Sequence, residues 1–340
     1  MKYTFSYTFP HRHFINIEFT VKNVESDELE IQLPAWRPGR YELGNFAKNI
    51  QKWAAFGEFG EALNFHKITK DKWLVQANEN KTVTIRYNYY ANELNAGSTF
   101  LDPTQLYVNP VNCCLYVPGR ENEPCEIELA VPENYEVATG MKKVRKNSFT
   151  VRDFHELADS PFIASPSLKH DSFSCCNVLF HIWFQGSCYP DWAKIKTDFI
   201  KYTEQQIAVF GEFPVNEYHY IYQILPFKAY HGVEHQNSTV CSLGPGHDLM
   251  KKELYDEFLG VSSHELFHAW NVKSIRPVEM QPYDYSKENY SRSGYVAEGI
   301  TTYYGDLMLY RSGVFSAMEF LKLLAVQIQR HFDNFARFSY

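Results

Sequence analysis

The chain contains, at residues 261–273, the stretch VSSHELFHAWNVK. Two histidines, His264 and His268, lie four positions apart in it, and Glu265 follows the first of them. On a helix, residues four apart lie one turn along the axis and roughly 40° around it, so both imidazoles can reach one metal ion. Glu265 can then face a water molecule at that ion and take its proton as the water attacks a polarised carbonyl. The alternative is two histidines on a partly exposed helix face.

A metal site of this kind needs a third protein ligand, and Glu298 is the candidate. It lies thirty residues beyond His268 in the run YVAEGI, residues 295–300, where its neighbours are apolar or small. A carboxylate there is costly to bury unless it is paired or bound to a metal. The alternative is a surface glutamate near a helix N-terminus, where the helix dipole favours negative charge. A His, His, Glu ligand set favours Zn²⁺, one ion per chain.

The first half of the chain alternates apolar residues with polar or small ones over short runs. This period of two is typical of strands with one buried face. The apolar positions include Tyr3, Phe5, Tyr7, Ile15, Ile17, Phe19, Leu29, Ile31, Val83, Ile85, Tyr87, Ile127 and Leu129. Turn sequences rich in Pro, Gly and Asn separate the runs. We therefore expect residues 1–165 to form an N-terminal antiparallel β-sandwich domain.

Helical spacing begins after a stretch rich in Ser and Pro that follows Pro161. The pattern predicts helices over residues 191–211, 249–270, 295–311 and 316–335, the first with Asp191 as its N-cap. A β-prone strand, residues 218–225, and a loop rich in glycine lie between the first two helices. We expect residues 166–340 to form a second domain, which makes the fold class α+β with two domains.

Composition excludes several classes of protein. Hydrophobic residues make up 45% and charged residues 21%, and the net charge is −7. This balance argues against a large nucleic-acid-binding face, and no apolar run approaches the ~20 residues of a membrane helix. The N-terminus lacks an apolar leader, and the seven cysteines contain no CxxC pair and fit free thiols in a reducing compartment. We expect a cytoplasmic protein without nucleic-acid or membrane partners; its oligomeric state is open.

The residues around the two histidines resemble a known family. The run HELFHAWNVK, residues 264–273, with Ile275-Arg276-Pro277 after it, closely resembles the zinc-helix signature of the glycyl aminopeptidase family. These gluzincin metallopeptidases are relatives of aminopeptidase N with a thermolysin-like catalytic domain. The run EGITTYYGDL, residues 298–307, is similar to their third-ligand helix. The resemblance implies that His264, His268 and Glu298 bind zinc and that Glu265 is the general base.

The resemblance extends upstream to the run HGVEHQNS, residues 231–238, which is similar to the family's Gly-Gly-Leu-Glu-His segment. It implies that Glu234 binds the free α-amino group of a peptide and that Gly232 and Val233 contact the substrate. From the residues alone, Glu234 is a surface charge on a loop. His231 stands where the family usually has glycine, which leaves the preference for small N-terminal residues open. The family likeness also implies that the strand over residues 218–225 is the edge strand that pairs with the substrate.

The N-terminal half is similar to the family in LPAWRPGRY, residues 33–41, and in DSPF, residues 159–162. We interpret both as structural, a turn and a packing corner, and give substrate contact by Arg37 or Arg40 little weight. Family members usually continue with further helices and a C-terminal PDZ domain. The chain is therefore expected to be truncated in its C-terminal helical part and to lack that domain. No tyrosine, including Tyr303 and Tyr304, can be assigned to oxyanion stabilisation.

The function expected from these observations is a zinc-dependent aminopeptidase that acts on short peptides and prefers small N-terminal residues such as Gly or Ala. One alternative is a gluzincin endopeptidase in which Glu234 is structural. Another is a truncated, catalytically inactive module that binds zinc and peptides. Blocking the amino group of a peptide distinguishes the first two, because only an exopeptidase requires that group.

Overall fold

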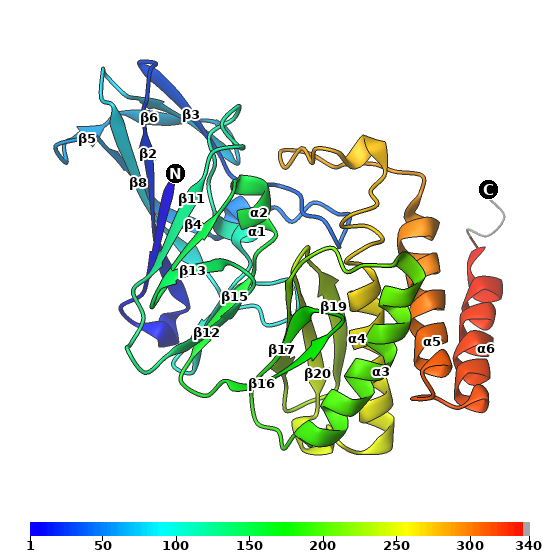
Figure 1. Cartoon of the computed structure of the whole chain (residues 1–340). Coiled ribbons are helices and arrows are strands. Elements are labelled where there is room, and N and C mark those ends of the chain that lie inside the picture. The colour runs from blue at the N-terminus through cyan, green and yellow to red at the C-terminus, as the bar shows by residue number, and fades with distance from the viewer. Residues whose placement is uncertain (336–340) are drawn as a thin grey trace. The chain divides into compact units, whose positions relative to one another are not determined.

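The computed structural model describes residues 1–335, and the chain divides into two compact units (Figure 1). The N-terminal unit comprises Met1–Lys169 together with Val278–Tyr290. The C-terminal unit comprises His170–Pro277 and the residues from Ser291 onward. The second unit is thus interrupted by a short segment that belongs to the first.

Three sheets build the N-terminal unit. The largest has the strand order β13-β14-β11-β1-β2-β8-β4-β5. Its strands are β1 (Lys2–Ser6), β2 (Phe14–Lys22), β4 (Ile50–Phe56), β5 (Ala62–Leu63), β8 (Thr82–Tyr90), β11 (Cys125–Leu129), β13 (Lys142–Arg145) and β14 (Ser148–Val151). The second sheet contains β12 (Glu136–Thr139), β15 (Phe162–Ser165), β10 (Gln105–Val108) and β9 (Phe100–Asp102). The third contains β3 (Glu28–Gln32), β7 (Lys72–Gln76) and β6 (Phe65–Thr69).

In several of these strands, among them β1, β2, β7 and β8, alternate residues face a common core, as the period of two in the sequence predicts. In β2, Ile15, Ile17, Phe19 and Val21 are buried and the residues between them are not. A single hydrophobic cluster takes side chains from all three sheets. Short helical segments connect the strands: α1 (Pro110–Cys113), α2 (Phe154–Ala158), η1 (Pro10–Arg12) and η2 (Phe46–Asn49).

One strand pair departs from the expected antiparallel sandwich. β1 pairs with β11 in parallel, with Tyr3 opposite Ile127. The other edge of β1 is taken by β2, which follows it directly and runs antiparallel. β11 comes much later in the chain, after a connection long enough for a strand to return in the same direction. The large sheet is therefore mixed.

The segment Val278–Tyr290 packs on the motif around Trp36. The ring centroids of Tyr283 and Trp36 lie 5.4 Å apart, and the amide of Ala35 donates a hydrogen bond to the carbonyl of Tyr285 at 2.8 Å. Trp36 is fully buried. Residues from far along the chain thus complete the packing around this motif of the N-terminal unit.

The C-terminal unit is built on a five-stranded mixed sheet of order β16-β17-β18-β20-β19. Its strands are β16 (Lys169–Cys175), β17 (Val178–Gln185), β18 (Glu217–Ile224), β19 (Ala229–Glu234) and β20 (Ser238–Gly244). β17, β18 and β20 are mutually parallel, and β19 runs antiparallel along β20. Aromatic residues of the sheet form a second core with α3 (Trp192–Phe210) and α4 (Lys252–Phe267), which cover one face (Figure 1).

The strand that we expected at the sheet edge is central, and this expectation is wrong. β18 lies between β17 and β20, and every residue of it after Glu217 is buried. The edge strand is β19, which contains Glu234 and which we had interpreted as part of a loop. A run that is apolar and aromatic on both faces is typical of a strand covered on both sides, which explains the central position.

Further helical segments follow α4 in the described part of the chain. A π-helical turn, η5 (Tyr295–Ile300), leads into α5 (Thr301–Arg311), and α6 (Ala317–Asp333) comes last; η3 (Gly246–Asp248) and η4 (Val278–Met280) are single turns. The side chain of Asp191 accepts a hydrogen bond from the amide of Lys194 at the start of α3, so the expected cap is confirmed. Ser316 caps α6 in the same way through Glu319.

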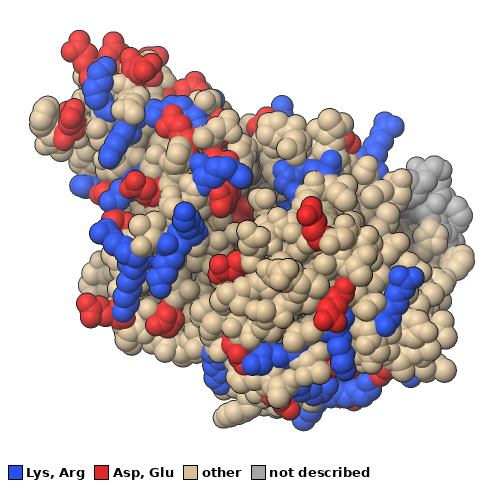
Figure 2. Space-filling model, viewed as in Figure 1, with Lys and Arg blue, Asp and Glu red and all other residues tan. Residues whose placement is uncertain are grey.

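The surface and the thiols agree with the composition. Basic and acidic side chains are interspersed on the face drawn in Figure 2. All seven cysteines are free, and all but Cys176 are buried. Within residues 1–335, no helix combines the length and the apolar character that are needed to cross a membrane.

Candidate metal centre

Helix α4 carries both histidines of the motif next to one another. The Nε2 atoms of His264 and His268 lie 3.0 Å apart, with the two rings at a steep angle. The helix is fixed from both sides: Gln206 of α3 donates to the carbonyl of Ser263 at 2.8 Å, and the Ser263 hydroxyl donates to the carbonyl of Gly305 in α5 at 2.7 Å. The helical spacing thus brings both imidazoles to one point.

Glu298 joins the histidines from the π-helical turn η5. Its Oε2 lies 3.5 Å from Nε2 of His264 and 3.6 Å from Nε2 of His268. Ligands at 2.0–2.2 Å around a tetrahedral zinc ion lie about 3.3–3.6 Å from one another. The three atoms therefore form a triangle of nearly the size that a zinc ion requires. Glu298 is 47% exposed, which leaves one side of the group open.

The hydrogen bonds of His268 leave its Nε2 available as a ligand. Its Nδ1 lies 2.7 Å from the carbonyl of Asn271, which can only accept, so the proton of the neutral ring is on Nδ1. Asn271 in turn donates through Nδ2 to the carbonyl of Val296 at 2.8 Å and lies 3.0 Å from the Thr301 hydroxyl. Asn271 therefore connects the end of α4 to the turn that carries Glu298, which is how outer groups orient metal ligands.

In a second cluster of two histidines and a glutamate, the hydrogen bonds place the ring proton differently. The Nε2 atoms of His181 and His219 each lie 3.1 Å from Oε1 of Glu217. Here Trp183 donates its indole N–H to Nδ1 of His219 at 3.1 Å. An indole is a donor only, so the proton of neutral His219 is on Nε2 and points at Glu217. With its proton on this nitrogen, neutral His219 donates to Glu217 and its Nε2 is not available as a metal ligand.

Glu265 lies beside the histidines and is almost completely buried, with 4% of its surface exposed. Burial raises the pKa of Glu265 to about 8, an effect that His268 opposes and that the carboxylates of Glu234 and Glu298 reinforce. A carboxylate with a pKa near neutrality can both accept and release a proton at physiological pH. The hydroxyl of Thr239 lies 3.5 Å from Oε2 of Glu265.

Gly232 of β19 lies directly against Glu265. A Cβ at position 232 would stand 2.1 Å from Oε1 of Glu265, closer than any real contact. The strand can therefore pass the glutamate only because position 232 has no side chain. This contact explains the glycine independently of any substrate.

The Gly232→Ala substitution is expected to displace the Glu265 carboxylate, since the new methyl group occupies its place. Misplacing a reacting group by about 1 Å can cost about 10²-fold in rate. We expect a loss of that order in kcat for peptide hydrolysis with zinc content unchanged, measured beside Gly294→Ala, a glycine with nothing within 4 Å of its Cβ position. Equal activity of the two variants would contradict this role of Gly232.

Glu234 lies on the same strand and faces the same group. It is 4% exposed, and its Oε1 is buried without a hydrogen-bond partner within residues 1–335. One potential ligand atom from each of Glu234, Glu265 and His268 lies within 4.8 Å of the other two. Two buried carboxylates this close repel one another unless a positive charge lies between them. The position at the sheet edge, two residues after Gly232, accounts for the orientation, because alternate residues share one face.

Val233, the two tyrosines after Glu298 and Asp306 have less direct relations to the histidines. The side chain of Val233 is buried, so only its backbone can reach a ligand. Tyr304 stacks on Phe267, with ring centroids 5.2 Å apart, and Tyr303 is 45% exposed. Asp306 makes no hydrogen bond to either histidine within residues 1–335, and burial raises its pKa to about 6. It lines a cavity of about 230 Å³ beside Glu298, a position that no sequence pattern indicated.

Comparisons with known proteins agree with this architecture. The profile of the peptidase M61 N-terminal domain matches residues 2–166, and the profile of the M61 glycyl aminopeptidase matches residues 257–340. A crystal structure of an aminopeptidase N family protein from Idiomarina loihiensis is 31% identical, with a TM-score of 0.88 over 95% of this chain and 56% of that one. The chain thus spans little more than half of that protein. No curated protein matches the chain.

More distant structures share the fold alone. An M1 zinc metallopeptidase from Deinococcus radiodurans is 14% identical, with a TM-score of 0.51 over 92% of this chain and 70% of that one. A mutant of that enzyme with a bound Tyr-Ser-Ala substrate gives a TM-score of 0.53 at 14% identity, over 92% of this chain and 71% of that one. The fold is therefore that of the aminopeptidase-like metallopeptidases. Within this class, the chain belongs to the M61 glycyl aminopeptidase family.

Proposed function

We propose that the protein is a zinc-dependent aminopeptidase that removes small N-terminal residues, such as Gly or Ala, from short peptides. The observation that carries the proposal is Glu234, a buried carboxylate beside Glu265 and His268 with one oxygen that has no hydrogen-bond partner within residues 1–335. A carboxylate in this position is suited to the α-ammonium group of a peptide. The C-terminal unit is then the catalytic domain, of the thermolysin-like gluzincin type.

The metal would be held by Nε2 of His264, Nε2 of His268 and Oε2 of Glu298, whose mutual distances fit a zinc ion. When bound, zinc polarises the scissile carbonyl and lowers the pKa of water. Glu265 accepts the proton of the attacking water while the oxygen of that water bonds to the carbonyl carbon. Glu265 then passes the proton to the leaving nitrogen as the peptide C–N bond breaks. Its raised pKa suits both transfers.

Glu234 fixes where the peptide is cut. An ammonium group that leaves water requires a carboxylate partner, and a partner next to the reacting groups places the first peptide bond at them. The same positive charge would relieve the repulsion between the buried carboxylates of Glu234 and Glu265. A peptide without a free amino group offers neither interaction.

Strand β19 supplies a backbone surface for the substrate. It is the last strand of its sheet, and no other strand within residues 1–335 pairs with its outer edge. An extended peptide can add to such an edge through main-chain hydrogen bonds. Gly232 and Val233 lie in the middle of this strand, which supports their proposed contact with the substrate backbone.

The proposal is tested by comparing Gly-Ala-Phe and Ala-Ala-Phe with the same peptides after N-acetylation, using the zinc-loaded protein. We expect release of the first residue from the free peptides and no cleavage of the acetylated ones. Cleavage of both forms at internal bonds would identify an endopeptidase instead. Cleavage of neither form by a protein that retains one zinc ion would support a binding module without activity.

A further inference from the structure

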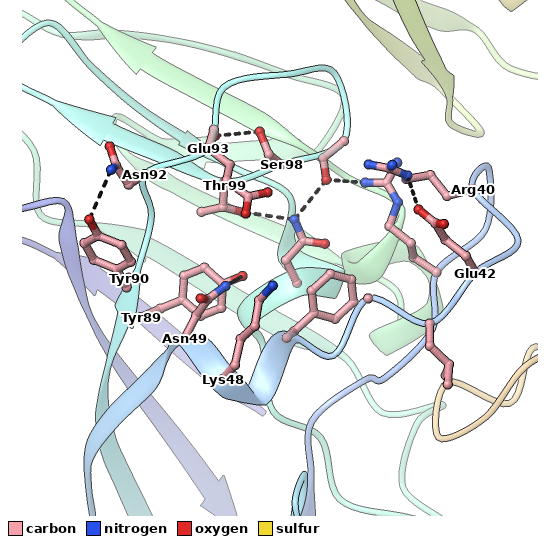
Figure 3. A pocket seen from close by; sticks show the side chains of 16 residues that line it. Arg40, Glu42, Lys48, Asn49, Tyr89, Tyr90, Asn92, Glu93, Ser98 and Thr99 are labelled. Atoms are coloured by element: carbon pink, nitrogen blue, oxygen red, sulfur yellow. Dashed lines mark hydrogen bonds and ion pairs between the residues drawn. The ribbon is translucent and has the colours of Figure 1, made fainter.

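A cavity of about 350 Å³ lies within the N-terminal unit and is not used by the proposed reaction. Its walls come from η2 with the loop before it, from the end of β8, and from the loop at residues 92–99 (Figure 3). Asn112 of α1 closes it. Every residue that lines it belongs to this one unit.

We call this cavity the η2 pocket. Hydrogen bonds within the protein fix the positions of the residues that line it. The carbonyl of Gly97 accepts from the guanidinium of Arg37 and, at 3.0 Å, from Nδ2 of Asn112. A Cβ at position 97 would overlap the guanidinium, so the loop approaches Arg37 only because this residue is glycine. The Ser98 hydroxyl donates to the carbonyl of Glu93 at 2.6 Å and Asn95 accepts from the amide of Gly97 at 2.9 Å. A preformed pocket loses little conformational entropy when it binds a ligand.

The pocket presents one cation and one anion that do not pair with other residues. Figure 3 shows Lys48 extending from η2 into the pocket, with Glu93 and Thr99 on the opposite wall. Both Lys48 and Glu93 are exposed, and neither takes part in an ion pair within residues 1–335. The remaining charges at the rim differ, because Arg40 and Glu42 neutralise one another at 2.8 Å. Two separate opposite charges across a pocket are complementary to a zwitterion.

Aromatic side chains form the apolar part of the pocket. Tyr89 is buried and its hydroxyl accepts a hydrogen bond from Asn49 at 3.0 Å, so its ring is fixed in place. Phe46 occupies the space next to Gly44, where a Cβ would lie 2.1 Å from the ring. Oδ1 of Asn112, which also lines the pocket, is buried and has no hydrogen-bond partner in the described part of the chain. Apolar walls with a few fixed polar groups are typical of small-molecule sites.

We propose that the η2 pocket binds a free α-amino acid with an apolar side chain. Lys48 binds its carboxylate, Glu93 binds its ammonium group, and its side chain packs against Phe46 and Tyr89. The zwitterion supplies one charge to each wall, whereas a simple anion or an amine satisfies only one of them. The volume of the cavity exceeds that of a single amino acid, which leaves room for the side chain.

The test is isothermal titration calorimetry with leucine, leucinamide and N-acetyl-leucine as the probes. The Glu234→Gln variant is used throughout, because Glu234 is the proposed amine partner in the other unit. We expect leucine to bind and the two blocked ligands, each of which lacks one charge, to bind at least about 10-fold more weakly. Lys48→Gln and Glu93→Gln are expected to weaken leucine to the same extent. Lys143→Gln and Glu136→Gln, exposed charges of β13 and β12, serve as matched controls.

Each alternative result overturns the proposal. Absence of heat with leucine shows that the pocket is not an amino-acid site. Equal affinity for the three ligands shows that the pocket does not recognise the ammonium and carboxylate groups of the ligand. Unchanged leucine affinity in Lys48→Gln and Glu93→Gln places the binding elsewhere. Because titration needs no turnover, the outcome is independent of whether the chain hydrolyses peptides.

Discussion

Exchange of Glu265 for glutamine is expected to lower kcat by about 10²–10⁴-fold, the contribution typical of a positioned general base. Glutamine has the same shape but cannot accept a proton, so the water molecule loses its base while the surrounding packing stays intact. The buried carboxylate also disappears, so we expect no loss of thermal stability. The measurement is hydrolysis of alanyl-p-nitroanilide together with the zinc content of each preparation.

Glu253→Gln is the matched control for this substitution. Glu253 lies in the first turn of the same helix α4, where its side chain is exposed. We expect wild-type activity from it and one zinc ion per chain in both variants. If Glu265→Gln retained full activity with zinc bound, Glu265 would not be the base. If it lost zinc, its role would be in the metal site.

The second large effect is expected from Glu234→Gln. This change removes the negative charge that is proposed to pair with the substrate's ammonium group, and loss of one partner of a buried ion pair costs about 2–4 kcal/mol. That corresponds to a fall of about 30- to 1000-fold in kcat/KM for peptides with a free amino group. Since the residue does not belong to the metal ligands, zinc binding is expected to persist.

A more specific readout comes from the choice of substrate. The wild-type protein should cleave free peptides and leave acetylated ones intact, whereas Glu234→Gln should lose most of that difference. Glu234→Asp keeps the charge but shortens the side chain, so we expect it to recover part of the preference. A Glu234→Gln variant that still discriminates fully between free and acetylated peptides would show that another group recognises the amine.

The local part of the site could be predicted from the sequence, because spacing along a helix fixes which residues share a face. His264 and His268 meet for this reason alone. For Glu298 the residues alone left a metal ligand and a surface glutamate open, and the family likeness favoured the ligand, since nothing between His268 and Glu298 shows that a π-helical turn will return to α4. The contact between Gly232 and Glu265 could not be predicted at all, because it joins a strand edge to a helix.

Long-range pairings account for the remaining differences in the fold. The alternation of β2 predicts its buried face, but no local pattern shows that β1 pairs with β11 in parallel or that β18 lies inside its sheet. The return of Val278–Tyr290 to Trp36 is of the same kind. The motif at residues 33–41 had been interpreted as a turn and a packing corner. Its tryptophan is indeed buried, while Arg37 and Arg40 line a pocket together with residues 42–49 and residues between 89 and 112.

The most direct measurement is hydrolysis of glycyl- and alanyl-p-nitroanilide by the purified protein, first after removal of metal with a chelator and then after addition of one equivalent of Zn²⁺. The account predicts no hydrolysis without metal and full recovery at one zinc ion per chain. Hydrolysis that survives complete removal of metal, or zinc that binds equally well to a His264→Ala/His268→Ala double variant, would contradict it.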